Sequence, residues 1–305
     1  MTSWPKLYTA FGAQWQADTP LAHFDLATRD RSETAASIDA IRVRRVAALT
    51  PRKSLHTVNG GCVYVDGFRL AWHDEVTFDV HDGSRIDYVP GPGWTGDMPA
   101  AFYSTVAALT LAARGALPCH ASAVEFGGKA VLLAGAAGAG KSTLAASLLT
   151  RGGRLLADDL TIIAPVSPDG PFIATRGRPG IRLHCDTALR VAAVERHSLP
   201  GDQRGKWLVR PIARSPYDAV PLAGVVLLGD EHGTLQRGDN KILLGPHLFR
   251  PRWLAALPGH ADRLRMTLEI ASRVPSRSVG PGEGFYRDPA AIERAWSAIT
   301  TMLAR

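Results

Sequence analysis

One segment of the chain, Gly135-Ala136-Ala137-Gly138-Ala139-Gly140-Lys141-Ser142, fits the pattern G-x-x-x-x-G-K-[ST] at every required position. An apolar run of strand length, 129–134, precedes it, and a helix-forming segment, 143–149, follows it. A strand that passes through a glycine-rich loop into a helix gathers backbone N–H groups and the positive end of the helix dipole at one point. The segment therefore predicts an α/β fold with a site for nucleotide phosphates.

Within this loop, Lys141 is expected to reach the β- and γ-phosphates, and Ser142 is expected to hold Mg²⁺. The other residues expected to bind the nucleotide are Gly135, Gly138, Ala139, Gly140 and Thr143. A loop of this kind does not distinguish kinases, ATPases, GTPases and transporters from one another, so the reaction has to be inferred from other residues.

Charge and cysteine content narrow the class of protein. The 305 residues carry a formal charge of +7, mostly from arginine, which favours anionic ligands. No basic run with interleaved aromatic residues is present, so we expect no nucleic-acid partner. The three cysteines lack C-x-x-C spacing, which argues against a zinc site and a disulfide framework. Without a signal-peptide pattern or an apolar run of spanning length, we expect a cytoplasmic protein with no membrane partner.

Turn signals and a proline/glycine-rich break predict two domains. Asp66-Gly67 and Asp82-Gly83 each separate two short alternating segments, which indicates two β-hairpins. Residues 90–99 are rich in proline and glycine. We therefore predict a mainly β domain over 1–99 and a catalytic domain over 100–305.

Later segments of the chain carry weaker patterns. A buried helix is expected over 104–117, and a strand that His120 begins is expected over 119–126. Leu264, Leu268 and Ala271 fit one apolar helix face. The stretch 196–214 is polar and arginine-rich, and its basic residues are interpreted either as a substrate clamp or as a solvated loop. These are Arg204, Lys206, Arg210 and Arg214.

Two adjacent acids narrow the chemistry. Asp158 and Asp159 end the short strand that follows the loop helix. The carboxyl end of such a strand lies beside the phosphate site of an α/β sheet. One acid can bind Mg²⁺ while the other takes a proton from an attacking hydroxyl, because neighbouring residues of an extended chain point in opposite directions. The pair favours phosphoryl transfer, with a solvated turn as the alternative.

The run from His120 to Ile163 resembles the catalytic core of the HPr kinase/phosphorylase family. The likeness lies in His120, the turn Gly127-Gly128, the phosphate loop, and Leu155-Leu156-Ala157-Asp158-Asp159. A looser likeness covers 176–183, so the resemblance spans about 118–183. It implies a P-loop kinase core akin to the HPr kinase C-terminal domain and to phosphoenolpyruvate carboxykinase.

The resemblance also implies cofactors, partners and roles. ATP and Mg²⁺ would be the cofactors, and the partner would be a peptide or protein with a serine hydroxyl. Asp158 would be the general base, Asp159 would assist with the metal or substrate, and His120 would lie near the transferring group. Arg176 would steady phosphate charge.

Departures from the family pattern affect the expected substrate. Ala121 and Ala137 replace the usual glycine and serine, and 1–99 lacks a match to the HPr kinase regulatory domain. A divergent branch that phosphorylates lasso-type precursor peptides fits better. An HPr kinase/phosphorylase, a small-molecule hydroxyl kinase and a nucleotide-binding module without transfer activity remain alternatives, and whether the protein forms a homo-oligomer stays open.

Overall fold

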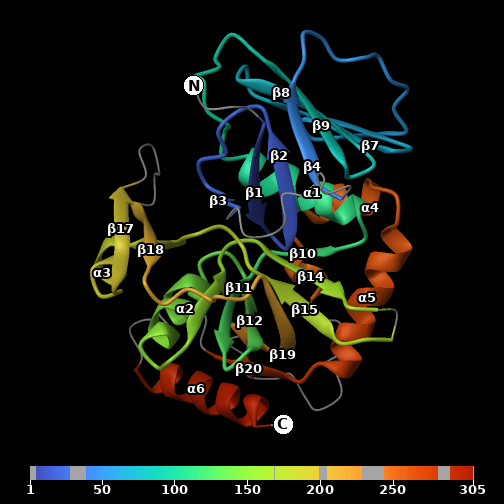
Figure 1. Ribbon diagram of the computed structural model, residues 1–305. Coiled ribbons are helices and arrows are strands. Elements are labelled where there is room, and N and C mark those ends of the chain that lie inside the picture. The colour runs from blue at the N-terminus through green and yellow to red at the C-terminus, as the bar shows by residue number, and fades with distance from the viewer. Residues whose placement is uncertain are drawn as a thin grey trace. The chain divides into compact units, whose positions relative to one another are not determined.

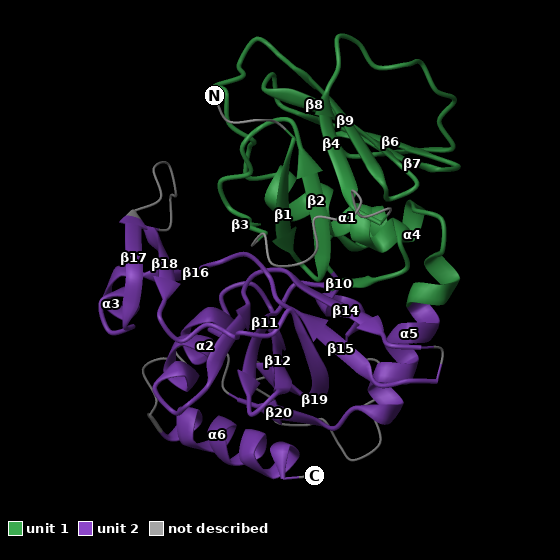
Figure 2. Ribbon diagram, viewed as in Figure 1, with its two compact units in different colours: residues 1–118, 249–263 green, residues 119–248, 264–305 purple. Residues whose placement is uncertain are grey.

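The chain forms two compact units, each built from two stretches of sequence (Figures 1 and 2). The computed structural model describes residues 5–27, 39–167, 169–198, 205–228, 244–280 and 289–304. Unit 1 comprises 1–118 and 249–263, and unit 2 comprises 119–248 and 264–305. The boundary falls after Pro118, whereas the sequence prediction places it after residue 99. The fold is mixed α/β.

A large, mostly antiparallel sheet makes up most of unit 1. Its strands follow the order β3-β1-β2-β4-β9-β8-β7-β6-β5. They are β1 (Lys6–Ala10), β2 (Ala13–Ala17), β3 (Asp25–Leu26), β4 (Ile41–Arg45), β5 (His56–Val58), β6 (Gly61–Tyr64), β7 (Gly67–Trp72), β8 (Val76–His81) and β9 (Arg85–Pro90). The two predicted hairpins are confirmed as the antiparallel pairs β6–β7 and β8–β9.

One face of this sheet is shielded from solvent, because every second residue on its strands is apolar and points to that face. Phe68, Phe78 and Ile86 are fully buried there. A π-helical turn, Phe102–Val106, leads into α1 (Ala107–Ala113), and α4 (Pro251–Ala256) belongs to the same unit. The predicted helix over 104–117 is thus shorter than expected, and the chain is already extended in β10 (Leu117–Cys119).

Unit 2 holds a mixed sheet in the order β14-β15-β19-β12-β11-β13, with β20 beside β19. A smaller sheet has the order β16-β18-β17. The strands are β11 (Ser122–Phe126), β12 (Lys129–Gly135), β13 (Arg154–Ala157), β14 (Thr161–Pro165), β15 (Phe172–Thr175), β16 (Ile181–His184), β17 (Ala193–Ser198), β18 (Lys206–Pro211), β19 (Ala219–Leu228) and β20 (Ser276–Val279).

Helices α2 (Lys141–Leu149) and α6 (Pro289–Leu303) pack against the larger sheet of unit 2. Their apolar residues, such as Leu144, Leu148 and Ile299, share one core with the central strands. The other helices among the described residues are α3 (Cys185–Ala188), the 3₁₀ turn Gly245–His247, and α5 (His260–Arg273), which crosses the unit boundary. None of the described helices has the length and apolar character needed to cross a bilayer.

Candidate functional site

The glycine-rich loop lies between β12 and α2, as the sequence pattern predicts. Gly135, Gly138 and Gly140 all adopt positive φ angles, of 155°, 89° and 91°. Gly140 is the N-cap of α2, and the first N–H groups of any helix lack intrahelical acceptors. Residues 136–138 are exposed, whereas Ala139 is buried under the loop in the core. The loop therefore presents backbone to solvent at the positive end of a helix.

Lys141 folds back over this loop. Its Nζ atom donates hydrogen bonds to the carbonyl oxygens of Gly135 and Ala136, each at 2.9 Å. Burial lowers the pKa of Lys141, while the nearby carboxylates of Asp158 and Asp159 oppose that shift. The ammonium group is thus already placed at the mouth of the loop, where a phosphate can replace the two carbonyl acceptors.

Asp158 is buried beside the start of α2 and accepts three hydrogen bonds. Its Oδ1 atom accepts from the Ser122 hydroxyl at 2.6 Å and from the Ser142 hydroxyl at 2.8 Å. Its Oδ2 atom accepts from the backbone N–H of Arg182 at 3.0 Å. Residues from β11, α2 and β16 therefore converge on one carboxylate that is only 4% exposed.

Asp159 lies in different surroundings, because its φ of 68° turns the chain as it leaves β13. Its Oδ1 atom is 3.4 Å from His120 Nδ1, and its Oδ2 atom is 3.8 Å from the Arg178 guanidinium. Burial and the charge of Lys141 lower the pKa of His120. The Asp159 side chain is 27% exposed, so a ligand can reach it.

His120 reaches this group from a connection between strands. The prediction that it begins a strand is wrong, since β11 starts at Ser122. The His120 backbone N–H instead donates to the carbonyl oxygen of His247 at 2.7 Å, a contact with a segment far along the chain. The His120 Nδ1 atom also lies 3.1 Å from the backbone oxygen of Asp159.

Arg176 turns away from the two aspartates. Its guanidinium donates to Asp218 Oδ1 at 2.7 Å, and its backbone N–H donates to the Asp218 carbonyl oxygen. Arg178, two residues later, is the arginine of this loop that faces Asp159. Thr143 lies on the first turn of α2, partly exposed.

Sequence reasoning missed three residues that the fold brings to this place. Ser122 holds Asp158, Arg178 faces Asp159, and His247 lies close enough to Lys141 and His120 for both to lower its pKa, although burial is the main cause. The Arg-x-Arg spacing offered a signal for Arg178. Nothing in the sequence signals His247, because it approaches from a segment far along the chain.

The donor set at the head of α2 fits Mg²⁺. Magnesium takes few protein oxygens and keeps several waters and substrate phosphates. Ser142 and Asp158, whose oxygens lie 2.8 Å apart, provide such a pair. Across the described chain, no cluster of three or more His, Cys, Asp or Glu residues has metal-binding geometry. The two predicted metal ligands, Ser142 and Asp159, have no described bond to one another, whereas Asp158 contacts Ser142 directly.

The predicted basic clamp falls partly outside the described residues. Arg204 is not described, whereas Lys206 and Arg210 lie on β18 and Arg214 follows it. The described residues on either side of the undescribed part belong to β17 and β18, which pair with each other. Lys206 is near enough to Lys141 to affect its pKa.

No family model and no curated protein matches the chain. Among solved structures, the chain is similar to the HPr(Ser) kinase/phosphatase from Coxiella burnetii. That match has 18% sequence identity and a TM-score of 0.27, and it covers 39% of this chain and 71% of the other. The contacts within the site and the sequence motifs, rather than this likeness, are the basis for a function.

Proposed function

We propose that this protein is a Mg·ATP-dependent kinase that phosphorylates a serine hydroxyl of a peptide or protein. The observation that carries the proposal is the meeting of two features. The head of α2 presents Lys141 and Ser142, and the end of β13 presents two carboxylates against it. A phosphate cradle beside a reachable carboxylate is what phosphoryl transfer to a hydroxyl requires.

The loop and Lys141 would hold the phosphates. The exposed backbone of residues 136–138 and the first turn of α2 offer N–H donors, and the Lys141 ammonium adds a full positive charge. Bound Mg·ATP supplies the γ-phosphoryl group and the metal charge. The residues present only position that charge, and their preorganisation lowers the barrier.

The contacts favour a division of labour between the aspartates that differs from the one the resemblance implies. Asp158 contacts Ser142 and is only 4% exposed, so we assign it to the metal side. Asp159 is more exposed and lies beside His120. We assign Asp159 as the base that accepts the proton of the serine hydroxyl.

The acceptor we propose is a serine of a ribosomal, lasso-type precursor peptide, because the sequence resemblance implies that substrate class. The test incubates the full chain with Mg·ATP and serine-containing peptides, with Ser→Ala peptides as controls, and measures added phosphate by mass spectrometry. Transfer to free serine or a sugar, but not to peptides, would favour a small-molecule kinase. ATP binding with no transfer to any acceptor would indicate a regulatory module.

Two matched variants test the division of labour. Asp159→Asn is expected to keep ATP binding and Mg²⁺ dependence and to lower kcat by about 100-fold or more. Asp158→Asn is expected to raise the Mg²⁺ concentration needed for half-maximal rate, because the negative charge that would attract the metal is lost while an oxygen that can accept from Ser142 remains. If instead Asp158→Asn abolishes transfer at saturating Mg²⁺ while Asp159→Asn does not, the base is Asp158.

A further inference from the structure

The unit 1 sheet has a second, charged face. Strand residues alternate between the two faces, so the partners of the buried apolar residues on β4, β7, β8 and β9 point the other way. Five arginines, four aspartates and one histidine gather there or in the adjoining turns. We call this set the arginine–aspartate cluster: Arg42, Arg44, Arg52, Arg69, Arg85, Asp66, Asp79, Asp82, Asp87 and His81.

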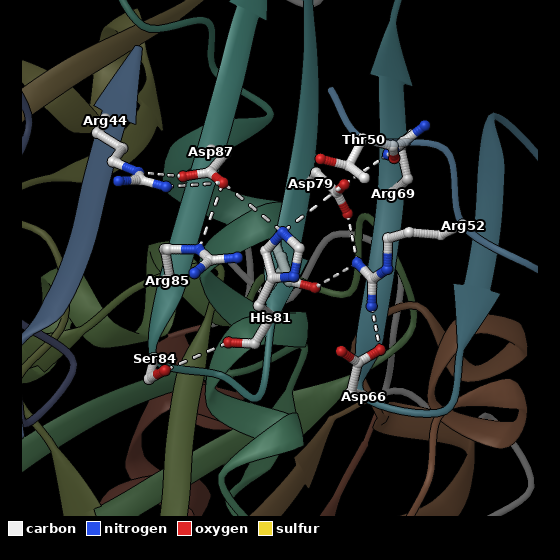
Figure 3. Close-up of polar contacts among 11 residues, drawn as sticks. Arg44, Thr50, Arg52, Asp66, Arg69, Asp79, His81, Ser84, Arg85 and Asp87 are labelled. Carbon is white, nitrogen blue, oxygen red and sulfur yellow. Dashed lines mark hydrogen bonds and ion pairs between the residues drawn. The ribbon is translucent and has the colours of Figure 1, made fainter. Parts of the chain in front are cut away.

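Two carboxylates in the cluster are largely buried and each is held by two arginines (Figure 3). Asp87 Oδ1 lies 2.6 Å from Arg44 Nε, and its Oδ2 lies 3.3 Å from Arg85 Nε. Asp79 is bound at 2.5 Å by both Arg52 and Arg69. These ion pairs hold the charged groups of Asp79 and Asp87 and of their arginine partners in place.

The His81 ring lies between the two carboxylates, with Nε2 3.7 Å from an oxygen of Asp79 and 3.7 Å from an oxygen of Asp87. Burial lowers the pKa of His81, which disfavours a positive charge on the ring. The five arginines then exceed the four aspartates, and the cluster carries one uncompensated positive charge.

A cavity of about 250 Å³ lies among these residues, and His81 and Ser84 are part of its lining. Arg42 and Arg85 lie directly opposite each other on the parallel strands β4 and β9, and both line the cavity. Like charges directly opposite each other destabilise a sheet. The Arg85 Nε atom is buried and forms an ion pair with Asp87 at 3.3 Å without a hydrogen bond, so its terminal nitrogens are the ones that an anion in the cavity would contact. An anion placed between the two guanidinium groups would relieve their mutual repulsion.

We propose that this cavity is a binding site for one carboxylate, presented by an acidic residue of a peptide. Arg42 and Arg85 would bind the carboxylate, since guanidinium groups match its planar geometry. Asp66 and Asp82 also line the cavity, and they would accept N–H groups of the flanking peptide. The same two carboxylates disfavour a phosphate dianion or a nucleic acid, because the surplus is a single charge. All these residues lie in unit 1, so the proposal is independent of the phosphoryl-transfer site.

The test measures binding of two blocked peptides to the full chain, acetyl-Gly-Gly-Glu-Gly-Gly-amide and its Gln counterpart, by ligand-observed NMR. The Glu peptide is expected to bind about tenfold or more tightly than the Gln peptide, as a charge-assisted bond to a carboxylate requires. Arg42→Gln is expected to remove that preference. Arg42 is exposed on its strand, so this variant should fold.

A neighbouring arginine provides the matched control. Arg45 is also exposed on β4 but lies outside the cluster, so Arg45→Gln should leave the preference for Glu unchanged. Equal binding of the Glu and Gln peptides, or full retention of the preference in Arg42→Gln, would overturn the proposal. Tighter binding of a phosphoserine peptide than of the Glu peptide would overturn the single-charge argument and identify a phosphate site instead.

Discussion

Asp158 and Asp159 are neighbours in sequence, yet they meet different partners. The positive φ of Asp159 separates them, so that Asp158 lies beside Ser142 and Asp159 faces His120 and Arg178. Positive φ is uncommon for a residue with a side chain and persists when the surroundings hold it in place. The strain at Asp159 therefore coincides with the residue that we assign as the base.

In the phosphoryl transfer that we propose, Arg178 rather than Arg176 is expected to stabilise the developing charge. Arg178→Gln should lower kcat by about 100-fold with little change in ATP affinity, because a donor aimed at developing charge acts mainly in the transition state. The measurement is steady-state kinetics with a peptide acceptor. Arg176→Gln is the control, and its partly exposed pair with Asp218 should cost at most about 1 kcal/mol of stability with kcat retained. If Arg176→Gln lowers kcat and Arg178→Gln does not, then Arg176 is the arginine that stabilises the developing charge.

His81 should make the free energy of unfolding depend on pH. Burial lowers its pKa in the folded chain below the ordinary value of about 6.5. The unfolded chain therefore binds more protons as pH falls through about 6.5, and stability declines toward the lower folded pKa. His81→Gln should flatten this decline in urea unfolding curves measured between about pH 7 and 5. An unchanged slope would show that His81 does not carry the effect.

At the scale of elements, the loop between β15 and β16 packs against β13 and helps to hold Asp158 in place. Gly177 donates its N–H to the Leu156 carbonyl oxygen at 2.8 Å, and an added Cβ would lie 2.9 Å from the Ala157 Cβ. Only glycine allows the loop to lie this close to β13. The loop then delivers the Arg182 N–H to Asp158.

Gly177→Ala should therefore destabilise the fold by about 1–3 kcal/mol, the usual cost of overpacking, and lower kinase activity as well. Urea unfolding measures the change in stability, and the phosphorylation assay measures the change in activity. Gly245→Ala is the matched control for stability, since a Cβ there meets nothing within 4 Å. Equal free energies of unfolding for the two variants would mean that β13 and the loop can move apart without a loss of stability.

Local patterns predicted some elements well and others poorly. The hairpins at Asp66-Gly67 and Asp82-Gly83 were predictable because turn chemistry and alternation act within a few residues. The face predicted for α5 is wrong: Leu264 and Leu268 are 54% and 50% exposed. Met266 and Ile270 are buried instead, together with Arg263. A charged residue at a core position conceals the true face from any hydrophobic pattern.

At the scale of the whole molecule, the loop motif does not predict the residues that reach the site from distant segments of the chain. Lys141, Ser142 and the aspartate pair were predictable because they follow one another along the chain. Ser122, Arg178 and His247 were not assigned roles, because their places depend on how separate strands and turns come together. The domain boundary depends on the same long-range return of the chain.

Arg263 holds unit 1 together where the chain returns to it. Its buried guanidinium donates to the carbonyl oxygens of Leu254 and Leu257 at 2.7 and 2.8 Å, and to that of Ala112 at 3.2 Å. Arg263→Met should lower the free energy of unfolding by about 2–4 kcal/mol, because these buried carbonyls lose their donor. Arg265→Met is the control in the same urea titration. Its long contact with Glu269 is exposed and should matter by less than about 0.5 kcal/mol.

The return of 249–263 to unit 1 also constrains the order of events during synthesis. The fully buried Phe68 packs edge-on against Trp253, at a ring distance of 5.8 Å. That tryptophan leaves the ribosome only after residues 119–248 have been translated, which takes roughly 6 to 26 seconds at ordinary elongation rates. The first strands to emerge must therefore wait for their last packing partner, and no single contiguous gene fragment encodes unit 1 without most of unit 2.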